Sequence, residues 1–215
     1  LRFYKSNNYI LVMSSLVSFT EKILKINKVK KGENVIISTS HIFDKTYVGA
    51  LMAALDNIEV NGFHMAINST SIDWKIGDWI WDTFKTADMI ICPRINYEPE
   101  GGDKATGSMP HYCDEFSELM SSGVRSLDIS IPVYLQRRYF PTPERTKRVV
   151  AGAELLDKCE IIRITNDSGT DLTANKKGRP GCGQMGFADV PSTWDNFGWG
   201  CVNSAPLENG ANGTL

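Results

Sequence analysis

The sequence lacks several patterns that would place it in a functional class at once. It has no C-x-x-C pair, and no G-x-G-x-x-G or Walker-type glycine pattern directly follows any strand predicted below. No apolar run approaches the roughly 20 residues that a membrane span requires. These absences argue against a zinc ribbon, a nucleotide-binding turn and a membrane protein.

Neither the cysteine spacing nor the net charge points to a particular kind of site or partner. The five cysteines are widely spaced and odd in number, so a disulfide framework or zinc site is disfavoured and reduced thiols in a cytoplasm are expected. Lys and Arg number 23 against 25 Asp and Glu, which gives a net charge of -2. This balance, without a basic patch, predicts neither nucleic acid nor an anionic membrane as a partner.

Apolar periodicity predicts alternating strands and helices through the first two thirds of the chain. Strands are expected at 35–39, 63–67, 88–92 and 124–129, and helices at 13–27, 44–57, 78–86, 113–121 and 142–157. Thr142 is the expected cap of the last helix, with Pro143 at its first position. Short strand–helix alternation predicts an α/β fold with a doubly wound, mainly parallel sheet.

The pattern changes after residue 160, where two short β-branched runs, 161–165 and 170–174, flank the turn 166–169. We therefore expect an α/β domain over 13–158 and the beginning of a second, β-rich domain over 159–215. Residues 1–12 are interpreted as an extension or translated flank before Met13. We hypothesise that the native protein continues beyond Leu215.

Two loop segments could approach a ligand. The glycine-rich stretch 178–189 lets backbone come close to a bound molecule, or it is a surface loop with a few tucked aromatics. Segment 94–110 follows a predicted strand at the carboxyl edge of the sheet, where ligands usually sit. It would be either a lid or a surface insertion.

Only three histidines are available for acid–base chemistry. His41 follows the first strand. His64 lies within a strand and is expected to be a satisfied core residue. His111 precedes the helix at 113–121, either as a general base or as an ordinary helix-entry residue.

The region from Pro141 to Leu215 resembles the 2,5-dihydroxypyridine 5,6-dioxygenases, and a weaker likeness extends back to about Met13. These non-haem iron ring-cleaving enzymes share a fold with the thermophilic metallo-aminopeptidases of peptidase family M29. The resemblance rests on the order and spacing of several short pieces: 141–144 with 147–149, 153–156, 168–171, 186–189 with 194–195, and 206–208 with 213–215.

The resemblance implies roles for particular residues. His111 is the nearest match to a histidine thought to take a proton from the substrate hydroxyl, although Tyr112 competes for that position. Gln184 stands where the family carries a substrate-pocket glutamate, and Asn196 where it carries a histidine. Trp194 is assigned to the same substrate-binding set. Gln184 in place of a glutamate and Asn196 in place of a histidine both keep hydrogen-bonding capacity but remove an ionisable group. These two replacements put the identity of the substrate in question.

The metal and the partners also follow from the resemblance. Fe(II) is the implied cofactor, with ligands beyond the position of Leu215, so no tightly bound metal is expected in residues 1–215. The implied partners are dioxygen and a hydroxylated N-heteroaromatic molecule, and a homo-oligomer is left open.

Two alternatives remain at this point. One is a fragment of an aminopeptidase with a two-metal site, in which Glu208, near Asp189 and Asp195, would be a ligand. The other is a binding or assembly domain without chemistry. The shared fold cannot separate oxygenase from peptidase.

Overall fold

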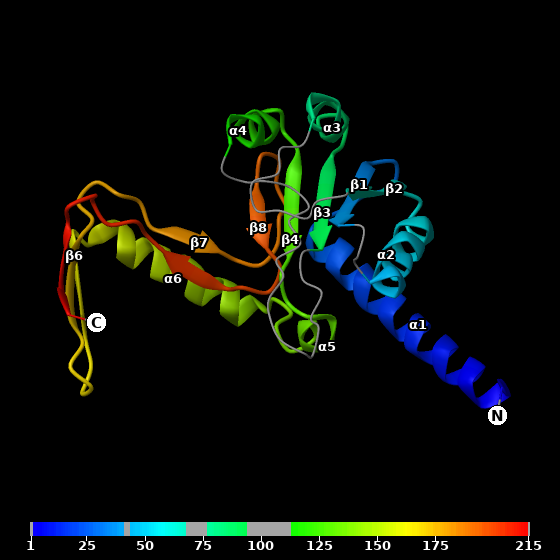
Figure 1. Ribbon diagram of the computed structural model, residues 1–215, viewed down its shortest axis with the longest axis horizontal. Coiled ribbons are helices and arrows are strands. Elements are labelled where there is room, and N and C mark those ends of the chain that lie inside the picture. Colours follow the sequence, from blue (N-terminus) through cyan, green and yellow to red (C-terminus); the bar gives the residue numbers. More distant parts are fainter. Residues whose placement is uncertain (1, 41–43, 68–76, 94–112, 215) are drawn as a thin grey trace. The chain divides into compact units, whose positions relative to one another are not determined.

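The computed structural model describes residues 2–40, 44–67, 77–93 and 113–214, and the side chains of all of these except 2–12 and 40. The chain forms two compact units (Figure 1). Unit 1 contains residues 1–140 and 187–198, and unit 2 contains residues 141–186 and 199–215. Each unit is described by itself.

Unit 1 is built on a five-stranded sheet in the order β2-β1-β3-β4-β8, and every neighbouring pair is parallel. The strands are β1 (Asn34–Ser40), β2 (Asn61–Ile67), β3 (Met89–Pro93), β4 (Arg125–Ile129) and β8 (Trp194–Asn196). All residues of β3 and β4 are buried, as expected for central strands covered on both faces.

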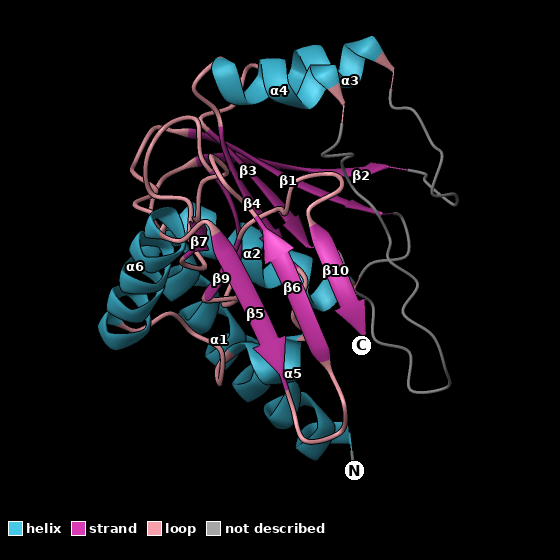
Figure 2. Cartoon of the chain, turned by 90° about the vertical axis from the view of Figure 1, so that its left-hand side faces the viewer, coloured by secondary structure: helices cyan, strands magenta, loops and turns pink. Residues whose placement is uncertain are grey.

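Helices cover both faces of this sheet. Helices α1 (Arg2–Ile26) and α2 (Lys45–Asn57) pack on the face that carries Val35, Ile37 and Ile91. Helices α3 (Asp78–Phe84) and α4 (Asp114–Ser121) pack on the opposite face, and Figure 2 shows them together on one side of the strands. The predicted doubly wound α/β fold is confirmed.

The fifth strand was not predicted. After α5 (Val133–Gln136) the chain enters unit 2, and it returns at residue 187 to add β8 to the sheet. The returning segment is anchored in unit 1, because the backbone N–H of Ala188 donates to Asn27 Oδ1 at 2.7 Å and Lys28 pairs with Asp189 at 2.6 Å. Phe197 is fully buried.

Unit 2 combines one helix with two small antiparallel sheets. Helix α6 (Pro143–Lys158) begins as predicted, with Thr142 Oγ1 accepting from the N–H of Arg145. Strands β5 (Ile161–Thr165), β6 (Asp171–Asn175) and β10 (Ala211–Thr214) form one sheet in the order β10-β6-β5. Strands β7 (Cys182–Gln184) and β9 (Cys201–Asn203) form the other.

The glycines of segment 178–189 serve close packing within unit 2. A Cβ atom on Gly183 would lie 2.8 Å from Val149 Cγ1 of α6, and a Cβ on Gly152 of α6 would lie 2.9 Å from Val202 Cγ2 of β9. Real Cβ contacts are longer than this, so the β7–β9 sheet approaches the helix only because these positions are glycine. Residues 181–186 match the pattern G-x-G-x-x-G, but residues 182–184 within it form strand β7 and not a nucleotide-binding turn.

Two expectations need correction. The division between the domains does not fall after residue 158, because α6 belongs to unit 2 and 187–198 belong to unit 1. The first helix extends back to Arg2 instead of starting at Met13. Segments around β7, β8 and β9 are short strands whose pairing partners lie far away in sequence, so local patterns could not indicate them. In the part of the chain that is described, no helix is long and apolar enough to cross a membrane.

Candidate functional site

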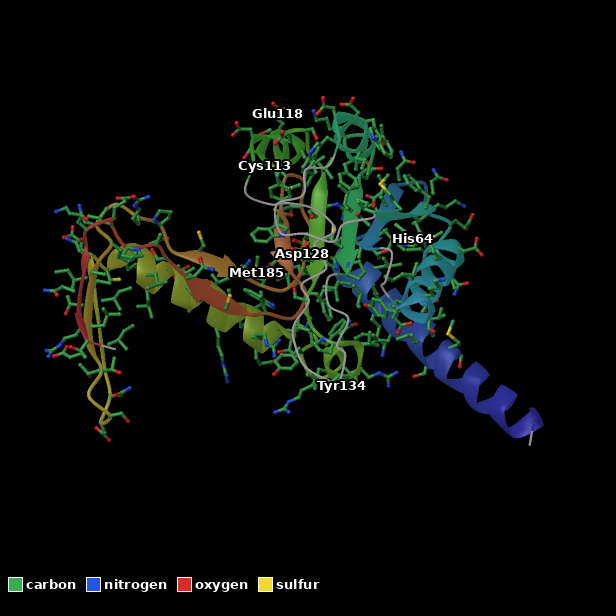
Figure 3. All side chains as sticks on the ribbon, in the orientation of Figure 1. His64, Cys113, Glu118, Asp128, Tyr134 and Met185 are labelled. Atoms are coloured by element: carbon green, nitrogen blue, oxygen red, sulfur yellow. The ribbon has the colours of Figure 1, made fainter. Side chains whose placement is uncertain are left out.

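The carboxyl half of β4 and strand β8 bring polar and aromatic side chains together in unit 1. Asp128 on β4 pairs in register with Asn196 on β8 and is fully buried. The indole Nε1–H of Trp194 donates to Asp128 Oδ2 at 3.2 Å. Asp128 is labelled on β4 in Figure 3. A buried carboxylate therefore fixes the orientation of Trp194.

Trp194 is further held by an aromatic contact from α4. The rings of Phe116 and Trp194 lie edge to face, with centroids 6.2 Å apart and an interplanar angle of 87°. Such pairs restrict both rings to one arrangement. Since Asp128 accepts its indole N–H, Trp194 can offer a ligand an aromatic surface rather than this donor.

Asn196 lies on the same face of β8, two residues after Trp194, and only 5% of it is exposed. The Ser130 hydroxyl donates to its amide oxygen at 3.3 Å. The amide nitrogen of Asn196 has no hydrogen-bond partner among the residues described. This arrangement leaves a neutral donor at the position where the resemblance implies a histidine.

Gln184 lies in unit 2, at the end of β7. Its register partner is Cys201 on β9, and the Cys201 thiol donates to Gln184 Oε1 at 3.2 Å. The side chain is half-buried. The structure thus places Trp194 and Asn196 together on one strand, whereas Gln184 belongs to the other unit.

His64 does not fit the expectation of a core residue. It lies within β2, as predicted, but β2 is an edge strand and the side chain is exposed. Its Nε2 is 2.7 Å from the Oγ1 of Thr39 on β1. Partial desolvation lowers the pKa of His64 below its ordinary value. An edge position cannot be distinguished from a central one by a local pattern.

The acidic residues named for the peptidase alternative have protein partners. Glu208 is exposed and pairs with Arg179 at 2.5 Å. A backbone N–H and the Arg179 guanidinium hold the pKa of Glu208 below its usual value. Asp189 pairs with Lys28, and Asp195 Oδ1 accepts from the N–H of Asn196 at 2.6 Å.

No group of three or more His, Cys, Asp or Glu side chains is arranged to hold a metal within the described ranges. Residues His41, His111 and Tyr112 and the expected lid 94–110 lie outside the residues that the structure describes. The proposed general base therefore stays a prediction, as does the metal role of Glu208.

Comparison with known proteins gives the family. The family model described as 2,5-dihydroxypyridine 5,6-dioxygenase (NicX) matches residues 15–215. The chain belongs to this family. A curated relative from Pseudomonas putida with the same description is 24% identical over 207 residues, which cover 94% of this chain and 58% of the relative. The chain thus spans about three fifths of that protein's length.

Two solved structures share the fold. The 2,5-dihydroxypyridine dioxygenase of Pseudomonas putida matches with a TM-score of 0.80 at 22% identity, over 94% of this chain and 59% of the other. AmpT from Thermus thermophilus matches with a TM-score of 0.56 at 14% identity, over 92% of this chain and 63% of the other. The likeness to the dioxygenase is the stronger of the two.

Three residues near the predicted ones were missed by sequence reasoning. Asp128, Ser130 and Cys201 each hold the side chain of a predicted substrate-binding residue. Asp128 carried a usable signal, because a carboxylate inside an otherwise apolar strand requires a buried partner. Ser130 and Cys201 carried none, since their contacts depend on strand pairing.

Proposed function

We propose that this chain is the amino-terminal part of an Fe(II)-dependent dioxygenase that cleaves the ring of a 2,5-dihydroxypyridine-like N-heteroaromatic compound. The family match over residues 15–215 carries the proposal. The co-substrate is dioxygen, and the enzyme acts in the cytoplasm. A homo-oligomer is compatible with this reading.

The residues that the structure describes contain no group of three or more potential metal ligands. We place the iron ligands in the part of the relatives' length that this chain does not span. When bound, Fe(II) would supply the reaction with dioxygen. The part played by this chain is to bind, orient and deprotonate the ring.

The side chains divide this work between them. In unit 1, Asn196 can donate through its side-chain amide, and Trp194, fixed by Asp128, offers an aromatic surface. In unit 2, Gln184 can donate through its amide nitrogen. The resemblance assigns each of these residues to substrate binding. His111 takes the proton from a ring hydroxyl, which makes the ring electron-rich. Because two amides replace ionisable groups, the ring substituents of the substrate differ from those of 2,5-dihydroxypyridine, or they bind in another protonation state.

The test uses the protein at the full length that its gene encodes, loaded anaerobically with Fe(II). Dioxygen uptake should match the loss of 2,5-dihydroxypyridine absorbance. Gln184→Ala should raise KM by about tenfold, the value of one hydrogen bond of roughly 1.4 kcal/mol. Glu208→Gln is the control, because it changes an exposed carboxylate that the dioxygenase proposal does not use. It should change neither kcat nor KM.

The aminopeptidase alternative predicts the opposite pattern. Release of amino acids from a peptide, abolished by Glu208→Gln and unaffected by Gln184→Ala, would replace the dioxygenase proposal. In the structure, the Glu208 carboxylate pairs with the Arg179 guanidinium. Metal-replete protein that consumes no dioxygen with any hydroxylated pyridine would also overturn the proposal.

A further inference from the structure

The two-stranded β7–β9 sheet has two chemically different faces. Side chains alternate along a strand, so Gly183 and Val202, which form one register pair, share one face. Gly183 packs against Val149 of α6, and Val202 packs against Gly152. The opposite face, directed away from α6, therefore carries the side chains of Cys182, Gln184, Cys201 and Asn203.

On that face, Cys201 controls the orientation of Gln184. The two residues are direct register partners, and their side chains meet at 3.2 Å between Sγ and Oε1. A thiol is a weak donor and sulfur a weak acceptor, so the favoured partner of the thiol is the amide oxygen. The contact turns the –NH₂ group of Gln184 away from Cys201.

A glutamine can offer a ligand either an acceptor or two donors, because its amide can rotate by half a turn. With Oε1 engaged by Cys201, Gln184 offers donors. Its Nε2 has no hydrogen-bond partner among the residues that are described. A glutamate at the same position would offer acceptors when ionised, so the preference for the ligand would have the opposite sign.

We infer that Cys201 is a positioning residue which makes Gln184 a donor-only contact, so that the site selects a ring substituent that accepts hydrogen bonds. Such substituents are a ring carboxylate, a carbonyl or a ring oxyanion. The inference rests on the proposed role of Gln184 in substrate binding. It adds a residue and a substrate class to that proposal.

The test compares two ring compounds of similar shape as competitive inhibitors of the full-length, iron-loaded enzyme. One is 5-hydroxypyridine-2-carboxylate, which presents an acceptor, and the other is 2-amino-5-hydroxypyridine, which presents a donor. The carboxylate should bind the wild-type protein about tenfold more tightly, because the mismatched compound leaves a polar group unpaired. Binding is also measured directly by calorimetry, so that inactive variants can be compared.

Four variants separate the contributions. Cys201→Ala should reduce the preference to about threefold or less, because the amide is then free to turn. Cys201→Ser should retain the preference, since a hydroxyl can also donate to Oε1. Gln184→Glu should reverse it. Asn203→Ala, on the same face of the β7–β9 sheet, should leave the preference unchanged.

A second readout detects the contact without turnover. The side-chain ¹H–¹⁵N resonances of Gln184 should show a restricted amide in the wild-type protein and in Cys201→Ser, and an averaged amide in Cys201→Ala. If both compounds bind and Cys201→Ala keeps the full preference, the role of Cys201 is overturned while the proposed function stands. If neither compound binds any variant although the Gln184 amide is restricted, the proposed substrate-binding role fails, and the selectivity fails with it.

Discussion

The two units of this chain are stabilised in different ways. Unit 1 encloses two apolar clusters, one on each face of its sheet, with residues such as Ile37, Leu51 and Phe84 fully buried. In the described part of unit 2, the buried apolar side chains are those of Pro141 and Val149. Unit 2 exposes several large apolar side chains instead: Val150, Leu155, Ile161, Ile164 and Trp199.

Hydrogen bonds and close backbone packing take the place of a core in unit 2. The ammonium group of Lys176, a residue only 2% exposed, donates to the carbonyls of Leu156 and Cys159 at 2.6 and 3.1 Å. Both carbonyls lie at the end of α6, where helix geometry supplies few donors. The Leu156 carbonyl also accepts from the backbone N–H of Cys159 at 3.3 Å. Since burial of apolar area is the main stabilising contribution in folding, we expect unit 2 to open at a lower free energy than unit 1.

The largest expected effect comes from emptying part of the unit 1 core. Phe84→Ala should lower the free energy of unfolding by about 3–5 kcal/mol, because Phe84 is fully buried and packs edge to face on Trp81. Urea denaturation followed by circular dichroism measures this change. Leu155→Ala is the matched substitution in unit 2, where 67% of the side chain is exposed, and should change stability by less than about 0.5 kcal/mol. Equal losses in both variants would contradict the comparison.

A smaller effect should follow from removing the Lys176 ammonium group, which caps the carboxyl end of α6 in unit 2. Lys176→Met keeps the length of the side chain but removes the ammonium donor from both carbonyls, which should cost about 1–3 kcal/mol. Native-state hydrogen exchange should show faster exchange confined to α6, β5 and β6. Lys177→Met is the control, because Lys177 is exposed and makes only a surface ion pair with Glu160. Unchanged exchange in Lys176→Met would show that the cap does not stabilise this unit.

The smallest expected effect is a pH dependence in unit 1. The pKa of His64 is lowered in the folded protein, so the unfolded chain binds the proton more tightly. The contribution of His64 is therefore complete above pH 6.5 and is lost as the pH falls through and below that value. Because the side chain is exposed, the loss should not exceed about 0.5 kcal/mol. His64→Gln should remove this slope from urea midpoints measured between pH 5 and 8, and a steeper slope in the variant would refute the assignment.

Local sequence was sufficient for strands β1 to β4 and for most of the helices because these elements are long or strongly patterned. Four of the five residues 35–39 are apolar or β-branched, and α2 carries its apolar residues on one face after the Asp44 cap. Thr142 and Pro143 likewise fixed the start of α6. By contrast, β7, β8 and β9 have three residues each and contain glycine, asparagine or aspartate, so pairing alone makes them strands.

The candidate site shows the same division. The motifs of the resemblance identified Gln184, Trp194 and Asn196 as residues worth locating. Their orientation depends on Cys201, Asp128 and Ser130, which are 17, 66 and 66 residues away. No local pattern contains these contacts. The donor-only character of the two amides therefore became visible only in the structure.

The sequence by itself determined the α/β class, the order of the first four strands along the chain and the family resemblance, because each depends on local periodicity or short motifs. The tertiary structure decided that residues 187–198 return to complete the parallel sheet of unit 1, and that glycines at 152 and 183 serve helix packing. It also decided which atoms of each amide are engaged. These features arise from contacts between residues far apart in the chain, and such contacts leave no periodic signal in sequence.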